Sequence, residues 1–197
     1  MEAELAVSRL AVFGYASLVS PESAAITLGR PVEIAALARL HGHARDWTVG
    51  RDNTATEKTF ARPDGSVPHY CLGLNVHPST GAEAPNGVLI EVSQAELDRL
   101  DIRELRFHRS EVTAEIESSA EFDAVFAYRA RPENHHPRPP ADAIVVATYP
   151  RHVEAAFAEL GPDQLELYRA TTHPPPVEVT EATLVADAIP PGNPRTW

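Results

Sequence analysis

The sequence predicts an α+β fold in which a curved, mixed or barrel-like β-sheet is accompanied by a few helices. Most of the chain consists of short apolar segments typical of strands, whereas helical periodicity occurs once in the middle and again late. This order favours a curved sheet over a doubly wound parallel sheet, in which strands and helices alternate regularly. The length of 197 residues suits one domain, residues 1–170, followed by a C-terminal extension, residues 171–197.

The predicted strands are short runs of apolar residues, some of which alternate with polar ones. They cover residues 10–13, 34–40, 44–49, 70–76, 88–92, 112–116 and 122–129. Between them lie segments whose composition is typical of loops. These are the polar residues 51–59, the turn-rich residues 78–87 and the proline- and histidine-rich residues 131–140.

Two early helices have recognisable ends. The first is expected to begin with Ser20 as its cap and Pro21 in its first turn, and to stop at Gly29. The middle helix begins after Ser93, which forms a capping box with Glu96 three residues later. We expect this helix to run to about residue 105.

Two further helices are predicted late in the chain. The first has apolar side chains at helical spacing, and these are Val153, Ala156, Phe157 and Leu160. The second covers residues 163–170. Beyond it the chain becomes rich in proline, and residues 177–189 are expected to form a late edge strand. We expect the extension to wrap the domain or to trail from it.

The composition is that of an ordinary globular protein with an acidic balance. Hydrophobic residues make up 43% and charged residues 23%, which is sufficient for a core. The net charge of −11 argues against nucleic acid or an anionic membrane as a partner, because a polyanion requires a basic surface. Nearly all cationic residues are arginine, which we interpret as the codon bias of a GC-rich, bacterial genome.

The cysteine content and the N-terminal residues indicate a reducing compartment. Cys71 is the single cysteine, so no intrachain disulfide and no cysteine-based zinc site can form. Residues 1–4 are acidic and lack the basic start of a signal peptide. No run of about 18 apolar residues is present to span a membrane. We expect a cytoplasmic monomer or homodimer whose partner is a small molecule.

Glu104 occupies an unusual place on the middle helix. At 100° per residue, Leu97, Leu100 and Glu104 fall within one narrow arc, while Arg103 and Arg106 point elsewhere. A carboxylate on an apolar stripe is costly to bury without partners. Glu104 is therefore a catalytic candidate, although a structural glutamate paired with an arginine, or a frayed helix end, explains the pattern as well.

The turn after the first strand is a second candidate site. The chain passes from a buried strand through Gly14, Tyr15, Ala16 and Ser17 towards a helix, which leaves several backbone N–H groups without partners. Such a turn can hold an anion. The nucleophile-elbow, dinucleotide-binding and P-loop patterns are all missing, and an ordinary strand-to-helix turn is the alternative.

Together these segments resemble the γ-glutamylcyclotransferase-like family, which includes glutathione-specific and γ-glutamylamine cyclotransferases. Residues 13–18, Phe-Gly-Tyr-Ala-Ser-Leu, are similar to its Tyr-Gly-Ser-Leu signature. Residues 86–92 followed by 97–104 resemble its second signature, whose closing glutamate is the catalytic acid/base. The resemblance extends over residues 10–160 and also includes 40–47 and 125–128.

The resemblance implies the curved fold of that family and an intramolecular acyl transfer. The α-amine of a γ-glutamyl substrate attacks its own γ-carbonyl, and 5-oxoproline and an amine are released. Glu104 corresponds to the acid/base, and partial burial is expected to raise its pKa above about 4.3. The backbone N–H groups of Tyr15, Ala16, Ser17 and Leu18 are expected to hold the substrate's α-carboxylate. No metal or organic cofactor is required.

Tyrosines are expected to line the same pocket. Tyr15, Tyr128 and Tyr149 are the candidates, and the resemblance implies that a substrate-facing tyrosine lies near the late proline-rich loop. Packed core or rim aromatics are the alternative for each of them.

The sequence departs from the family pattern at two positions. Ala16 replaces the usual glycine, which would cost about 1 kcal/mol if the loop required a positive φ there. Phe107 stands where many members have a tyrosine, so one hydroxyl is lost. A non-catalytic protein that kept the fold and cavity is therefore the alternative function. The substrate also stays open among glutathione, a γ-glutamyl amino acid and a γ-glutamyl amine.

Two other chemistries find little support in the sequence. The nine histidines include His41, His43 and the pair at residues 135–136, but no metal-binding motif is formed. Ser17 and Asp101 with a histidine fit no known order of a catalytic triad. We expect neither a metal site nor a nucleophilic serine.

Overall fold

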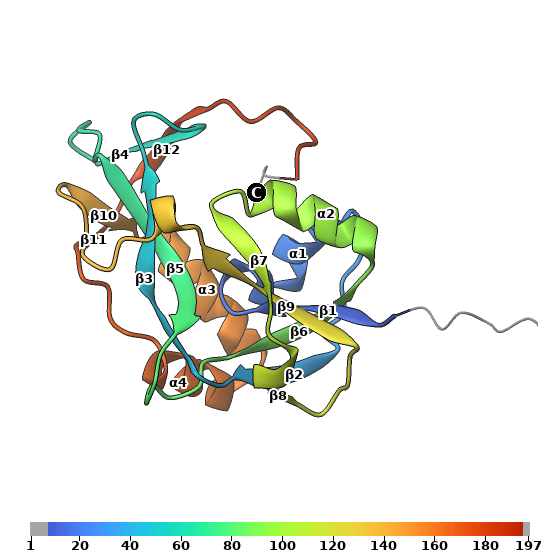
Figure 1. Ribbon diagram of the computed structural model, residues 1–197. Helices are drawn as coiled ribbons and strands as arrows, with labels where there is room; N and C mark the ends of the chain where they lie inside the picture. Colours follow the sequence, from blue (N-terminus) through green and yellow to red (C-terminus); the bar gives the residue numbers. More distant parts are fainter. Residues whose placement is uncertain (1–7, 195–197) are drawn as a thin grey trace, which may run out of the picture.

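The computed structural model, which describes residues 8–194, contains a curved six-stranded sheet and a four-stranded sheet whose strands are interleaved along the chain (Figure 1). The acidic residues 1–4 and the end of the predicted extension, residues 195–197, lie outside the described residues. The six-stranded sheet has the order β7-β9-β1-β6-β2-β8. Its strands are β1 (Leu10–Gly14), β2 (Ala36–Leu40), β6 (Asn86–Val92), β7 (Phe107–Glu111), β8 (Ile116–Ser118) and β9 (Ala124–Ala130).

The sheets are mixed and close towards one another. In the six-stranded sheet β1 pairs in parallel with β9, and the other neighbours are antiparallel. The second sheet has the order β11-β10-β5-β3. Its strands are β3 (His43–Asp52), β5 (Tyr70–Pro78), β10 (Ala143–Val146) and β11 (Val179–Thr180). The backbone N–H of Ala130 in β9 donates to Asn75 Oδ1 in β5 at 2.9 Å, which joins the two sheets. The predicted α+β fold with a curved, barrel-like mixed sheet is confirmed.

The helix ends follow the capping signals of the sequence. The helices are α1 (Pro21–Leu28), α2 (Gln94–Arg103), α3 (Thr148–Glu159) and α4 (Pro162–Ala170). The Ser20 hydroxyl caps α1, and Gly29 ends it with a φ of 73°. The capping box of Ser93 and Glu96 is formed at the start of α2. Figure 1 shows α1 and α2 side by side, and α3 leading into α4.

The structure corrects the prediction for residues 107–118. A strand at residues 112–116 is wrong, because Thr113–Glu115 forms a 3-10 turn between β7 and β8. Val112 is buried and its N–H donates to the Val125 carbonyl. Its apolar side chain is therefore explained by burial at the start of a turn and not by a place on the buried face of a strand. The strand β10 has no counterpart among the predicted strands, and β4 (Lys58–Ala61) begins within the predicted loop of residues 51–59.

The described part of the C-terminal extension contacts the rest of the chain along its length. The strand β11 pairs with β10, and β12 (Thr183–Asp187) forms a separate two-stranded sheet with β4. In Figure 1 the segment then arches across to the helices, where the Thr27 hydroxyl donates to the Pro194 carbonyl at 3.4 Å. Among residues 8–194, no helix combines the length and apolar character needed to cross a membrane.

Arg45 of β3 is the largest fully buried side chain of the core. Its guanidinium donates to six acceptors on segments far apart in sequence. These are Tyr15 O, Asn86 O, Asn86 Oδ1, Tyr168 O, Thr171 Oγ1 and Thr172 Oγ1, at 2.7 to 3.3 Å. It also lies over the Tyr168 and Phe157 rings, at 4.5 and 5.2 Å from their centroids. Burial lowers the pKa of Arg45 to about 9.

Replacing Arg45 by methionine should lower the free energy of unfolding by about 3–5 kcal/mol, because several buried oxygens lose their donors. Denaturant unfolding measures the loss. Arg39→Met is the matched control, because Arg39 is a partly exposed arginine of β2 that contacts Ala84 O and Glu83 at the surface. Its cost should stay below about 1 kcal/mol. Equal losses in the two variants would contradict the central role of Arg45.

Candidate active site

Glu104 lies where α2 ends, as the capping residue and not as part of the helix. Its φ and ψ are −89° and 39°, and its N–H donates to the Leu100 carbonyl at 2.8 Å. The Phe107 N–H in turn donates to the Glu104 carbonyl at 2.8 Å. Leu97 and Leu100 are fully buried, and the Glu104 side chain is 15% exposed. The tight turn therefore keeps the carboxylate largely out of solvent.

A small cavity surrounds the Glu104 side chain. Its volume, counted as the space that the centre of a water molecule can occupy, is about 40 Å³. All the site residues predicted from the sequence line it, and these are Tyr15, Ala16, Ser17, Leu18, Glu104, Tyr128 and Tyr149. Phe13, Leu74 and Phe107 complete the lining. We call this space the inner cavity. It brings the turn after β1, the end of α2 and the start of α3 to one place.

Arg103 is the main correction to the predicted site. Instead of pointing away, its side chain is 1% exposed, and its Nε lies 3.1 Å from Glu104 Oε1. It also donates to Ser17 Oγ, Ser23 O and Oγ, and Thr27 Oγ1, at 2.7 to 3.1 Å. Helical periodicity fails here because α2 ends at Arg103 and α1 packs against it. Arg103 thus joins Glu104 to the turn after β1.

Burial and nearby arginines act in opposite directions on Glu104. Burial raises the pKa of this carboxyl, since the charged form loses hydration. The positive charges of Arg103 and, to a smaller extent, Arg106 lower it, and burial is the larger effect. The pKa of Glu104 is therefore raised, in the direction expected from the sequence. Arg106 is itself engaged by both carboxylate oxygens of Glu57, at 2.7 and 2.9 Å.

The turn after β1, whose residues line the inner cavity, has backbone amides without acceptors in the described part of the chain. Among residues 8–194, the N–H groups of Ala16, Ser17 and Leu18 have no hydrogen-bond acceptor, whereas the next N–H, of Val19, donates to the Ala16 carbonyl. Ala16 has a φ of −142°, so the turn requires no positive φ at this position. The cost that a positive φ would impose on alanine at this position therefore does not arise.

The three candidate tyrosines differ in how their hydroxyls are used. Tyr15 donates to the Tyr128 carbonyl, and Tyr128 donates to Asp101 Oδ1, both at 2.6 Å. Burial raises the pKa of both hydroxyls, so they stay protonated. Tyr149, in the first turn of α3, packs edge-to-face on Trp47 with 5.9 Å between ring centroids. Tyr15 and Tyr128 therefore act as fixed walls of the inner cavity.

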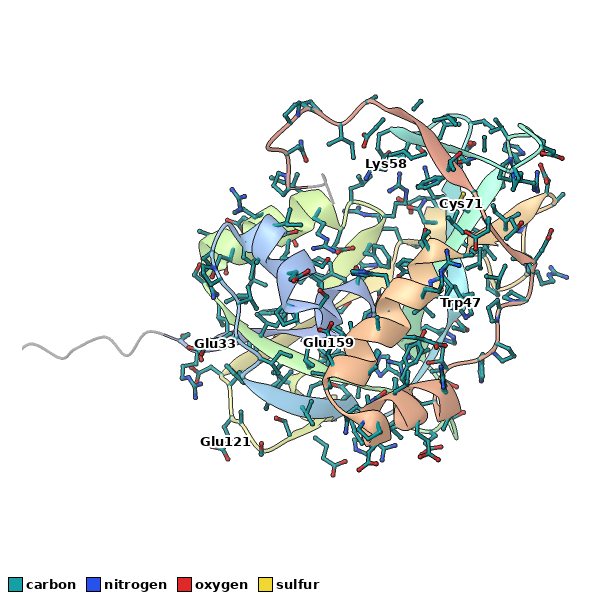
Figure 2. The ribbon with its side chains drawn as sticks, turned by 180° about the vertical axis from the view of Figure 1, so that it is seen from behind. Glu33, Trp47, Lys58, Cys71, Glu121 and Glu159 are labelled. Atoms are coloured by element: carbon teal, nitrogen blue, oxygen red, sulfur yellow. The ribbon has the colours of Figure 1, made fainter. Side chains whose placement is uncertain are left out.

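A much larger space opens from the inner cavity. On the same measure its volume is about 640 Å³, and we call it the outer cleft. The two spaces share Ser17, Leu74, Glu104, Phe107 and Tyr149. The far walls come from β3, β4, β5 and the segment after β11. No sequence motif marks these residues, because they come together only through strand pairing. Figure 2 shows Lys58 and Cys71, which both line the outer cleft, on the side where the C-terminal segment arches over.

The site offers no metal-binding arrangement in the part of the chain that the structure describes. No group of three or more His, Cys, Asp or Glu side chains is placed to hold an ion there. The chemistry available is that of one carboxyl group of raised pKa, a set of backbone amides and a buried guanidinium.

Comparisons with known proteins identify the fold. No protein-family model and no curated protein matches the sequence. A solved structure named "Gamma-glutamyl cyclotransferase" aligns with a TM-score of 0.59 and 16% identity, over 88% of this chain and 94% of that one. An uncharacterized protein from Homo sapiens has the same TM-score and identity, with 88% and 95% covered. YkqA from Bacillus subtilis reaches 0.53 at 16% identity, over 80% of this chain and 52% of that protein. The chain therefore has the γ-glutamyl cyclotransferase fold.

The raised pKa of Glu104 predicts a pH-dependent difference in stability between the wild type and Glu104→Gln. The folded protein holds the Glu104 proton more tightly than the unfolded chain does. The wild type should therefore lose stability relative to the variant as the pH rises from the ordinary glutamate pKa through the raised one. Denaturant unfolding of both proteins between about pH 4 and about pH 8 measures the difference. A slope of the opposite sign would contradict the raised pKa.

Proposed function

We propose that this protein is a cofactor-independent γ-glutamyl cyclotransferase, which releases 5-oxoproline and an amine or amino acid. The observation that carries the proposal is a mostly buried carboxyl of raised pKa, Glu104, in one small cavity with three backbone amides that have no acceptor among residues 8–194. The shared fold supports it. As part of the proposal, the enzyme acts in the cytoplasm as a monomer or homodimer on small-molecule substrates.

The amides of the turn after β1 bind the γ-glutamyl group. Their N–H groups at Ala16, Ser17 and Leu18 suit the substrate's α-carboxylate, since adjacent backbone N–H groups favour an anion. Holding this end folds the chain so that the α-amine approaches the γ-carbonyl. Because the reaction is intramolecular, orientation alone removes much of the barrier.

Glu104 moves the protons. Its carboxylate accepts a proton from the α-amine as the nitrogen attacks the γ-carbonyl carbon. The tetrahedral intermediate then collapses, the bond to the leaving nitrogen breaks, and the same proton passes from Glu104 to the leaving amine. Oε1 lies 3.1 Å from Arg103 Nε, which leaves Oε2 for this step. A raised pKa brings the carboxyl closer to the operating pH.

Arg103 is a positioning residue in this mechanism. It contacts Glu104 Oε1 and Ser17 Oγ at 3.1 Å each, so it fixes the distance between the base and the anion-binding turn. Its charge also limits how far burial raises the Glu104 pKa, which keeps part of the carboxyl ionised to act as the base.

The alternative is a non-catalytic binding protein that retains the cavity. The ion pair of Arg103 with Glu104 favours it, since a paired carboxylate can be purely structural. Ala16 argues less for this alternative than its sequence position indicates, because its φ of −142° is not positive.

The test is release of 5-oxoproline from a panel of γ-glutamyl compounds by the wild type and Glu104→Gln. We expect activity on at least one compound and a loss of kcat/KM of about 100-fold or more in the variant, because glutamine cannot carry the proton. Glu159→Gln is the matched control and should retain activity, since Glu159 lies at the other end of α3 from Tyr149 (Figure 2).

The controls distinguish a catalytic role of Glu104 from a purely structural one. Thermal unfolding followed by circular dichroism shows whether Glu104→Gln remains folded. If it is folded and as active as the wild type, the acid/base assignment is wrong. If no compound reacts although one binds with a measurable Kd, the binding-protein alternative is correct.

A further inference from the structure

The outer cleft faces the part of the substrate that the proposed reaction releases. It meets the inner cavity at Glu104, Phe107 and Tyr149. A γ-glutamyl group held in the inner cavity, with its γ-carbonyl beside Glu104, directs its leaving amine outward. The walls of the outer cleft therefore contact the leaving group, and this inference rests on the proposed function.

The walls of the outer cleft are predominantly apolar. The side chains that give this character come from five different elements and the C-terminal segment, and they are Ile26, Val49, Phe60, Leu72, Leu184 and Ile189. Ile26 and Leu184 are 55% and 45% exposed, although large apolar side chains are usually covered. Both belong to the lining of the outer cleft, so an apolar group bound there would cover them.

Several charged side chains of the outer cleft are engaged by the protein itself, whereas Glu22 at its edge is exposed. Arg106 is paired with Glu57, and Lys58 Nζ lies 3.8 Å from Asp187 Oδ2. Arg51 donates to Asn53 Oδ1, Thr56 Oγ1 and the Lys58 carbonyl, and its guanidinium lies over the Phe60 ring. Since Arg51, Lys58 and Arg106 already have partners, the apolar surface is the main feature of these walls that is left to select a ligand.

We propose that the outer cleft selects γ-glutamyl substrates whose leaving amine carries a bulky apolar group, such as an aromatic amino-acid side chain. A volume of about 640 Å³ accommodates such a group, and apolar walls gain free energy in proportion to the apolar area that they cover. Small or strongly polar leaving groups, including the cysteinylglycine of glutathione, do not cover these apolar walls, which then remain exposed to water.

The C-terminal segment contributes directly to this selectivity. Leu184 lies on β12, opposite Phe60 of β4, and Ile189 follows two residues after the end of that strand. The same segment is held by Asp187 beside Lys58 and by the Ala188 N–H, which donates to the Glu57 carbonyl at 2.8 Å. The segment therefore forms a fixed side of the outer cleft.

The test compares γ-glutamylphenylalanine with γ-glutamylglycine, which differ only in the side chain of the leaving amino acid. For the wild type we expect kcat/KM to be at least about tenfold higher for the phenylalanine compound, and higher than for glutathione. Leu184→Asp should reduce the phenylalanine-to-glycine ratio at least about fivefold, because it places a charge on the apolar wall. The neighbouring Val185→Asp should leave the ratio unchanged, since Val185 is 57% exposed and does not line the outer cleft.

Three outcomes would overturn the inference, and they are distinguishable. Equal kcat/KM values for the two compounds, or a preference for glutathione, reject apolar selection and leave the proposed reaction standing. A ratio that changes equally in Leu184→Asp and Val185→Asp rejects the role of this wall. If no γ-glutamyl compound releases 5-oxoproline, the proposed function fails and the inference fails with it.

Discussion

The burial of the Arg45 guanidinium is the constraint on which the remaining structure depends. A buried positive charge is tolerated only when oxygen acceptors surround it, and here they come from the turn after β1, from β6, and from the end of α4 with the residues that follow. Two of these acceptors, Tyr15 and Thr171, are more than 100 residues apart in sequence. The same contacts that satisfy the charge therefore fix the Tyr15 carbonyl, and with it the start of the turn after β1.

A second buried arginine has the corresponding role inside the candidate site. Arg103 donates hydrogen bonds to oxygens of α1 and of Ser17, and it lies against Glu104. Two buried guanidinium groups thus contact residues that line one small cavity, Arg45 through the Tyr15 carbonyl and Arg103 through Ser17 and Glu104. The arrangement places a fixed frame around the groups that the proposed reaction would use, and the value of this frame would lie in orientation rather than in added stability.

The features that the sequence predicts correctly depend on neighbouring residues. The caps at Ser20 and Ser93 and the stop at Gly29 require only local hydrogen bonds, and the structure has them. The strand β7 is not predictable from an apolar pattern, because Phe107 is its one apolar residue. The contact of Arg103 with Glu104 is not predictable either, because helical spacing ceases to apply where α2 ends. The signature residues from Tyr15 to Leu18 and Glu104 do line one cavity, while their roles stay predictions. The outer cleft carries no motif, since β3, β4 and β12 build it from distant segments.

The position of β12 has a consequence for how proteins of this fold can diverge. The strand is paired only with β4, and all five of its residues are exposed, so it lies outside the main core. Substitutions there need not disturb the packing around Arg45 or the geometry at Glu104. If the outer cleft selects the leaving group as proposed, the range of accepted substrates can drift through changes in a peripheral strand, while the machinery for ring closure stays constant.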